Sequence, residues 1–254
     1  MTTNNVKVQI KTSKELQIMR EGGKKLATVK SKLSEAVKEG VNAEKIENLA
    51  VKMIKKEGGK PSFKTVPDYY WATCVNINEG VVHGIPKDSL IFKKGDVVSV
   101  DVGMFYKGFH TDTSFTVGVK VDDKTKRFID TGKKALVEAI KKARPGNRIY
   151  DISESIESVL LKAGYKPVRA LVGHGVGREL HEDPQIPCFT SGNYSDSPII
   201  DEGAVIAIEV MYTMGSPNLV LDEDGWTIST ADGKIAGLFE ETVAVIDKGP
   251  KILT

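Results

Sequence analysis

The sequence predicts an α/β (α+β) fold in which two similar halves form one domain with an internal pseudo-twofold axis. The order helix, helix, strands occurs twice, at about 13–119 and at about 123–254. A shift of 106 residues also places four features of the first half on the second: Gly40 on Gly146, Ile46 on Ile152, Gly58 on Gly164, and Lys60-Pro61 on Lys166-Pro167. Chance recurrence of helix ends and Lys-Pro pairs is the alternative. We expect one domain, residues 1–254, with its site in the cleft where the sheets of the two halves meet.

The composition is that of a globular protein, with 40% hydrophobic and 28% charged residues and a net charge of +2. So small a net charge argues against nucleic acid or an anionic membrane as the main partner. The two cysteines, Cys74 and Cys188, stand alone in the sequence, which is typical of a reducing compartment. The sequence shows no signal peptide and no run of membrane-spanning length. We therefore expect a soluble, cytoplasmic protein.

The first half begins with a helical pattern over residues 13–39. Gly22-Gly23 within this pattern indicates either a close contact with another element or a break. A second helix begins at its cap, Asn42, and ends at Gly58. Residues 63–119 then read as strands and loops.

The second half repeats this order. Residues 123–143 predict a helix, and a shorter helix starts at Asp151, with Glu154 in the capping-box position. The shorter helix stops at Gly164, and strands return after Lys166-Pro167.

A hairpin over residues 97–117, VVSVDVGMFYKGFHTDTSFTV, carries two acids inside an apolar strand pair. Residues 105–108 fit a type I turn, because glycine is favoured at its fourth position. This turn would place Asp101 directly opposite Asp112 on one face of the hairpin. Like charges directly opposed across paired strands destabilise the pairing, so we expect a cation between Asp101 and Asp112. The alternative is that this face is solvated and that both acids are ordinary surface residues.

Three further acids lie in apolar segments of the second half. Glu209 is the one charge in AVIAIEVM, and Glu240 and Glu241 lie in IAGLFEETVAVI. Neither segment contains a basic residue, and an unpaired buried carboxylate is costly, so a metal is the expected partner. Because side chains alternate along a strand, only one of Glu240 and Glu241 can reach a given site.

Three histidines complete the candidate site. His174 lies among glycines in LVGHGVGRELHEDP, with His181 seven residues on, and His83 lies in VVHGIP. An isolated histidine is often a structural, hydrogen-bonded residue, but the glycines let backbone approach closely and leave the ring accessible. A site role for His174 therefore stands beside the structural one.

The ligand-type residues are four carboxylates and one imidazole: Asp101, Asp112, His174, Glu209 and Glu240. This set matches two divalent ions about 3.5–4 Å apart, bridged by carboxylates. Its oxygen-rich shell suits Mn, Fe(II), Co or Zn. Such a centre supports hydrolysis of an amide or ester and leaves His83 and His181 to bond the substrate and the tetrahedral intermediate.

Six motifs follow one another along the chain: VVHGIP, VDVGMFYKGFHTDTS, GHGVGRELHEDPQ, IAIEVM, DGWTISTADGK and FEETVAV. Together they resemble the bacterial type I methionine aminopeptidases, and the resemblance covers essentially the whole chain. It implies the pita-bread fold, a central antiparallel sheet with flanking helices, in agreement with the duplication. It also implies a dinuclear metal enzyme that removes the initiator Met from nascent chains when the second residue is small.

The resemblance also implies roles for the site residues. Asp101 and Asp112 would hold the metals with Asp112 bridging, His174 and Glu209 would bind one ion, and Glu240 would bridge. Glu209 would handle the proton of the attacking water. His181 would stabilise the tetrahedral oxygen, and His83 would contact the scissile amide.

Five positions match the family's methionine pocket: Phe63, Tyr69, Cys74, His83 and Trp226. Soft, apolar and aromatic walls suit a Met side chain. For Cys74 a buried, inert thiol is the alternative to direct contact, and Trp226 could equally belong to the core. Asn78 falls near the family's monovalent-cation loop, which implies a possible monovalent cation there.

Four positions depart from the family's pattern: Val66, Leu180, Val210 and Glu241. None of these departures removes a ligand, so they bear on the shape of the pocket and the tuning of the metal site. The resemblance further implies a monomer that meets nascent chains beginning with Met. Any transient ribosome contact is expected to come from the domain itself.

Two alternatives remain. X-Pro dipeptidases and aminopeptidases share the fold and ligands, and the Glu240-Glu241 pair leans toward them. However, they usually carry a separate N-terminal domain, for which the sequence leaves no residues, and the Arg of GHGVGREL and the HGIP motif favour Met removal. A non-catalytic pita-bread protein that binds the ribosome or RNA is the third hypothesis, and loss of ligands would be its mark.

Overall fold

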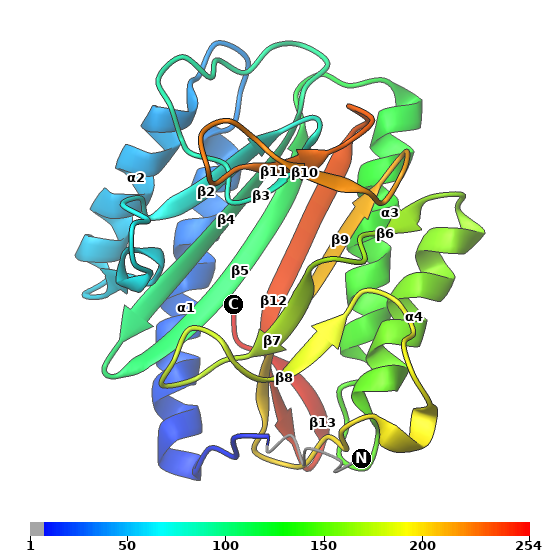
Figure 1. Ribbon diagram of the computed structural model, residues 1–254. Helices are drawn as coiled ribbons and strands as arrows, with labels where there is room; N and C mark the ends of the chain where they lie inside the picture. The colour runs from blue at the N-terminus through cyan, green and yellow to red at the C-terminus, as the bar shows by residue number, and fades with distance from the viewer. Residues whose placement is uncertain (1–7) are drawn as a thin grey trace.

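A computed structural model describes residues 8–254 of the chain. The expectation about the extreme N-terminus, residues 1–7, lies outside the described residues. A ten-stranded sheet has the order β1-β4-β5-β12-β9-β7-β8, with β2 beside β4, β6 beside β9 and β13 beside β12 (Figure 1). Every pair in it is antiparallel. Its strands are β1 (Lys60–Pro61), β2 (Thr73–Ile77), β4 (Val97–Tyr106), β5 (Phe109–Gly118), β6 (Lys166–Pro167), β7 (Val172–Gly175), β8 (Glu182–Pro187), β9 (Val205–Thr213), β12 (Ala236–Ile246) and β13 (Gly249–Ile252).

Four α-helices among the described residues flank this sheet: α1 (Ser13–Ala36), α2 (Ala43–Lys56), α3 (Asp123–Ile140) and α4 (Ile149–Lys162). Helix α1 packs on β4 and β5, and α3 packs on β9 and β12, so each half covers its own strands (Figure 1). Two separate apolar cores lie under the two helix pairs. A small sheet of β3 (Gly80–Val82), β11 (Ile228–Thr230) and β10 (Leu219–Leu221) crosses one end, and two short 3-10 helices span Phe63–Thr65 and Tyr194–Asp196. Within residues 8–254, none of the helices has the length and apolarity needed to span a bilayer.

The helices lie where the sequence predicts them, except that some of their ends differ by a few residues. Helix α1 stops at Ala36 rather than near 39, because Val37 already has an extended backbone. Helix α3 ends at Ile140 rather than at 143. Helix α4 begins two residues before the expected Asp151, whose carboxylate instead accepts the backbone N–H of Arg148 at 2.7 Å. Asp151 is therefore the third residue of the helix, in place of the expected capping box with Glu154.

The Gly22-Gly23 pair marks a close contact and not a break, since α1 is continuous through it. A Cβ atom on Gly23 would lie 2.5 Å from the carbonyl oxygen of Leu253. Only a residue without a side chain lets α1 approach the end of the chain this closely.

The features matched by the 106-residue shift occupy equivalent places. Gly40 and Gly146 have φ of 82° and 87°, and Gly58 and Gly164 have φ of 79° and 83°. The first Lys-Pro pair forms β1 beside β4, and the second forms β6 beside β9. Equivalent placement at one offset is what a duplication produces, and chance does not explain it.

The hairpin register is the main correction to the sequence-based prediction. Lys107 and Gly108 alone form the turn, with φ of 48° and 90°, and Tyr106 pairs with Phe109. Positive φ at both turn residues is typical of the type I′ turn, whose twist matches a two-residue hairpin better than type I. Asp101 therefore pairs with Ser114, and Asp112 pairs with Gly103. The two acids still share one face of the hairpin, but they lie on alternate rungs, with the pair Val102–Thr113 between them.

Candidate metal centre and substrate cavity

Two rungs of the sheet, with one rung between them, bring the five predicted ligands together. On the first rung Asp101 pairs with Ser114, and Ser114 pairs with Glu240. Glu240 in turn pairs with Glu209. Since directly paired residues point to the same side of a sheet, these three carboxylates share one face.

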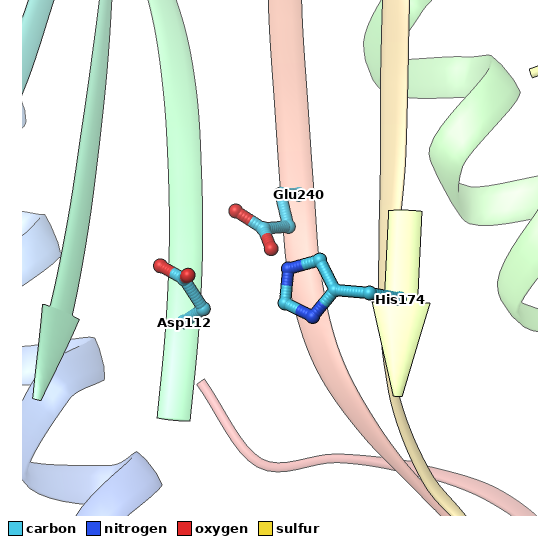
Figure 2. A group of neighbouring side chains, drawn as sticks. All are labelled: Asp112, His174 and Glu240. Carbon is cyan, nitrogen blue, oxygen red and sulfur yellow. The ribbon is translucent and has the colours of Figure 1, made fainter. Parts of the chain in front are cut away.

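The second rung adds Asp112 and His174. The backbone N–H of Asp112 donates to the hydroxyl of Thr242, whose partner on β9 is Ala207. Ala207 also pairs with His174 on β7. Figure 2 shows Asp112, Glu240 and His174 as neighbouring side chains, and one potential ligand atom of each lies within 4.8 Å of the others.

The carboxylates of this cluster lack compensating cations among the described residues. Oδ1 of Asp101 and Oε1 of Glu240 are buried without a hydrogen-bond partner. Burial, and then the neighbouring acids, raises the pKa of Asp101, Glu209 and Glu240 well above the usual range. Burial also raises the pKa of Asp112 to about 7. Orphaned oxygens in a cluster of acids are what a bound cation would satisfy.

His174 is oriented as a ligand. Its Nδ1 donates to the carbonyl oxygen of Gly175 at 2.8 Å, which leaves the lone pair of Nε2 facing the cluster, 3.4 Å from Glu209. Burial lowers the pKa of His174 to about 4, so the ring is neutral at pH 7. A neutral imidazole whose other nitrogen is held by a carbonyl is the usual form of a metal-binding histidine. The donor set of oxygens and one imidazole therefore fits divalent metal.

A cavity of about 160 Å³ opens directly onto the cluster. Every site residue expected from the sequence lines this cavity, together with Val66, Val82 and Leu180. The five ligand-type residues form one part of its wall. Another part consists of the expected pocket residues Phe63, Tyr69, Cys74, His83, His181 and Trp226. Val66 and Leu180, two of the departures from the family's pattern, thus shape the cavity.

The apolar part of the cavity is an aromatic wall centred on Tyr69. Its ring centroid lies 5.0 Å from that of Trp226 and 6.5 Å from that of Phe63. Its hydroxyl donates to the carbonyl of Thr73 at 2.9 Å and lies 3.2 Å from Sγ of Cys74. Trp226 is thus part of the cavity wall, which weighs against a purely core role. Burial raises the pKa of the Cys74 thiol well above its usual value, so this side chain is a neutral, soft surface.

His83 and His181 flank the junction between the aromatic wall and the acidic cluster. The ring of His181 lies 4.5 Å from that of His174, and His83 lies 6.5 Å from Trp226. Burial lowers the pKa of both rings, which favours neutral imidazoles at pH 7. His83 has φ of 60°, a conformation uncommon for a non-glycine residue and frequent at functional sites.

Glu241, which follows Glu240 on β12, points to the face of the sheet opposite the cavity. Its Oε1 lies 2.6 Å from Nζ of Lys30 on α1. The expectation that only one of Glu240 and Glu241 reaches the site is met, with Glu240 as that residue. The sequence argument missed that a helix supplies the cation for Glu241.

Sequence reasoning also missed two residues that support the cavity. Trp71 packs on Tyr69 with ring centroids 5.4 Å apart. Glu47, buried on α2, accepts hydrogen bonds from the backbone N–H groups of Ala72 and Thr73 and so anchors the start of β2. An acid on the apolar side of a helix was the available signal for Glu47.

Asn78, near the expected monovalent-cation loop, is committed to bonds within the protein. Its carbonyl accepts the N–H of Ala236, and its side chain bonds Val97 and Asp96. The monovalent cation therefore stays a prediction.

A buried cluster of acids and one histidine that opens to a cavity has the donor set of a metal-dependent hydrolase. The chain belongs to metallopeptidase family M24, whose sequence model matches residues 17–247. It is 38% identical to methionine aminopeptidase 1 of Bacillus subtilis over 96% of this chain and 98% of that protein. A methionine aminopeptidase of Clostridium perfringens is also 38% identical, with the same coverage.

Solved structures show the same fold. The crystal structure of a methionine aminopeptidase from Thermotoga maritima superimposes with a TM-score of 0.94 at 38% identity, covering 98% of this chain and 99% of that one. A prolidase from Pyrococcus furiosus superimposes with a TM-score of 0.77 at 23% identity, covering 96% of this chain and 65% of that one. The prolidase likeness shows the fold alone. The expected pita-bread fold is thereby confirmed.

Proposed function

We propose that this protein is a methionine aminopeptidase that removes the initiator Met from peptides and nascent proteins when the second residue is small. One observation carries the proposal: the acidic cluster and an aromatic, sulfur-containing pocket line the same cavity. The relatives named methionine aminopeptidase, matched over nearly their full length, support it. We further propose that residues 1–254 form a single catalytic domain.

Five residues would hold two divalent ions, namely Asp101, Asp112, His174, Glu209 and Glu240. Bound there, such ions act as Lewis acids and lower the pKa of water. Mn, Fe(II), Co and Zn all suit this donor set. We also carry forward a monovalent cation near Asn78.

The remaining steps belong to side chains of the cavity. The aromatic wall of Tyr69 and Trp226 would bind the Met side chain and exclude water. Glu209 would take the proton of the attacking water and return it to the leaving amine, since its carboxylate belongs to the cluster that lines the cavity. His181 would donate a hydrogen bond to the tetrahedral oxygen, and His83 would bond the scissile amide.

A second cavity of about 520 Å³ shares His83, His174, His181 and Glu209 with the first. It continues past β8, where Ala170 and Gln185 line it. We propose that it receives the substrate residues that follow Met. The small residue at position two would lie at the junction of the two cavities, between the histidines.

The test is Met release from Met-Gly-Met-Met by protein loaded with Mn(II) or Co(II), with a matched Met-Leu peptide as the poor substrate. We expect turnover of the first peptide, little of the second, and loss of turnover in EDTA. No Met release by protein with verified metal occupancy would end the proposal.

The X-Pro peptidase alternative has lost the observation that favoured it, because Glu241 points away from the cavity and pairs with Lys30. Turnover of Met-Ala against Ala-Pro substrates decides between the two. A protein that binds no divalent metal at all would revive the non-catalytic alternative.

Proposals about the cell follow from the substrate. We propose a monomer that acts in the cytoplasm on nascent chains, with any ribosome contact made transiently by the domain itself. Sedimentation with ribosomes carrying short Met-initiated chains would test the last point.

A further inference from the structure

A buried polar network lies on the helix-covered face of the sheet, directly behind the acidic cluster. Nζ of Lys30, from α1, lies 2.6 Å from Oε1 of Glu241 and 3.0 Å from the hydroxyl of Thr113. The side chains of Lys30 and Glu241 are each only 18% exposed. The hydroxyl of Thr254 donates to the other oxygen of Glu241 at 2.8 Å.

Thr113 connects this network to two of the proposed metal ligands. Its hydroxyl donates to the backbone carbonyl of Glu240 at 2.8 Å, and its backbone N–H donates to Oδ1 of Asp112 at 2.9 Å. Thr113 also pairs with Glu241 across β5 and β12. One residue, fully buried, thus ties together the two strands that present Asp112 and Glu240.

We propose that Lys30, Thr113 and Glu241 are positioning residues, which hold Asp112 and Glu240 in the geometry that binds metal from behind the sheet. This inference rests on the proposed metal centre. Lys30 orients the Thr113 hydroxyl by occupying its lone pair, so the hydroxyl proton is directed to the carbonyl of Glu240.

The physical need for such a network lies in the ligands themselves. Asp112 and Glu240 are like charges on neighbouring strands, and without metal they repel one another. Groups that hold metal ligands from behind typically contribute 10–100-fold to metal affinity. Lys30 also cancels the charge of Glu241, which would otherwise add to the repulsion around Glu240.

The decisive variant is Thr113→Val, which removes the hydroxyl but keeps the shape and every charge. Mn(II) binding to metal-free protein, followed by calorimetry, is expected to weaken by at least about tenfold. Thr113→Ser retains the hydroxyl and is expected to bind within about threefold of the parent, a margin well under the usual loss for such a group. Thermal melting in EDTA, recorded in parallel, separates metal binding from stability.

The ion pair is tested with Lys30→Met, against Lys32→Met as the matched control. Lys32 is on the same helix but pairs with Glu35 in solvent, at 54% and 60% exposure. We expect Lys30→Met to weaken Mn(II) binding and Lys32→Met to leave it unchanged. If Lys30→Met instead tightens binding, the network acts only through charge and the proposal is overturned.

Two further outcomes would contradict the inference or the metal centre on which it rests. If Thr113→Val melts at a lower temperature but binds Mn(II) like the parent, its role is merely structural and the inference fails while the proposed function stands. If the parent protein itself binds no Mn(II), the proposed metal centre fails first.

Discussion

Glu240 and Glu241 are neighbours on β12 with opposite surroundings. Glu240 faces the cavity, is 2% exposed and has an oxygen without a hydrogen-bond partner in residues 8–254. Glu241 faces the helices and is neutralised by Lys30. The cavity face around Glu240 gathers three further carboxylates, whereas the carboxylate of Glu241 on the helix-covered face lies beside a lysine.

The comparison shows how to distinguish a structural acid from a functional one. A carboxylate that only stabilises the fold has its cation within the protein, as Glu241 has. A buried carboxylate that lacks one is destabilising until a ligand arrives, and such groups cluster at functional sites. The orphaned oxygens of Glu240 and Asp101 therefore point to a cation from outside the chain.

The largest effect is expected from Asp112→Asn, which removes a ligand charge from the cavity face without creating a void. We expect no detectable Met release from Met-Gly-Met-Met, while circular dichroism remains close to that of the parent and the melting temperature in EDTA is not lowered. Unchanged turnover in this variant would mean that the ligands are misassigned.

The two adjacent acids should respond oppositely to amide substitution in metal-free protein. At pH 8, Glu240→Gln is expected to raise the melting temperature, because it removes a buried, uncompensated charge. Glu241→Gln should lower the free energy of unfolding by about 1–3 kcal/mol, because Lys30 loses a charged hydrogen-bond partner. Urea titrations in EDTA measure both, and a shift of the same sign in the two variants would contradict the comparison of the two faces.

The pH dependence of stability should also change with metal. Burial raises the pKa of Asp112 from its ordinary 3.8 to about 7, so the folded protein binds more protons than the unfolded chain between these values. Stability contributed by such a group is lost as the pH rises. Burial lowers the pKa of both His174 and His110 to about 4. These two shifts make stability rise with pH, but only below the ordinary histidine pKa of 6.5.

Above pH 6.5 the raised pKa values of the carboxylates therefore determine how stability changes with pH. We expect the melting temperature in EDTA to fall from pH 6.5 to pH 8, and to fall much less with saturating Mn(II), which binds the deprotonated acids. Scanning calorimetry at several pH values in this range, in EDTA and in Mn(II), measures both melting temperatures. A metal-free protein that becomes more stable toward pH 8 would show that the cluster is not strained by its charge.

The smallest effect concerns the soft wall of the pocket. Cys74→Ser exchanges a polarizable thiol for a smaller, more polar hydroxyl where a Met thioether is expected to bind. We expect a few-fold increase in KM for Met-Gly-Met-Met with little change in kcat. A KM equal to that of the parent would favour the alternative, in which Cys74 is a buried thiol without contact to substrate.

Local patterns were sufficient for much of this protein. Apolar periodicity and capping residues located the four helices, although the ends of α1, α3 and α4 shifted by a few residues. Strand alternation correctly separated Glu240 from Glu241. The hairpin register was wrong because it depends on whether Lys107 accepts a positive φ, and a lysine gives no signal of that in sequence.

The sequence by itself singled out the candidate metal ligands, because acids in apolar strands and a glycine-flanked histidine are visible without coordinates. Tertiary structure alone decided how they meet: two rungs of antiparallel pairing place Asp101, Asp112, His174, Glu209 and Glu240 on one face. It also gave Glu241 its cation, from a lysine 211 residues away in the chain. Partners so distant in sequence are chosen by packing, and packing follows from the whole fold and not from any local pattern.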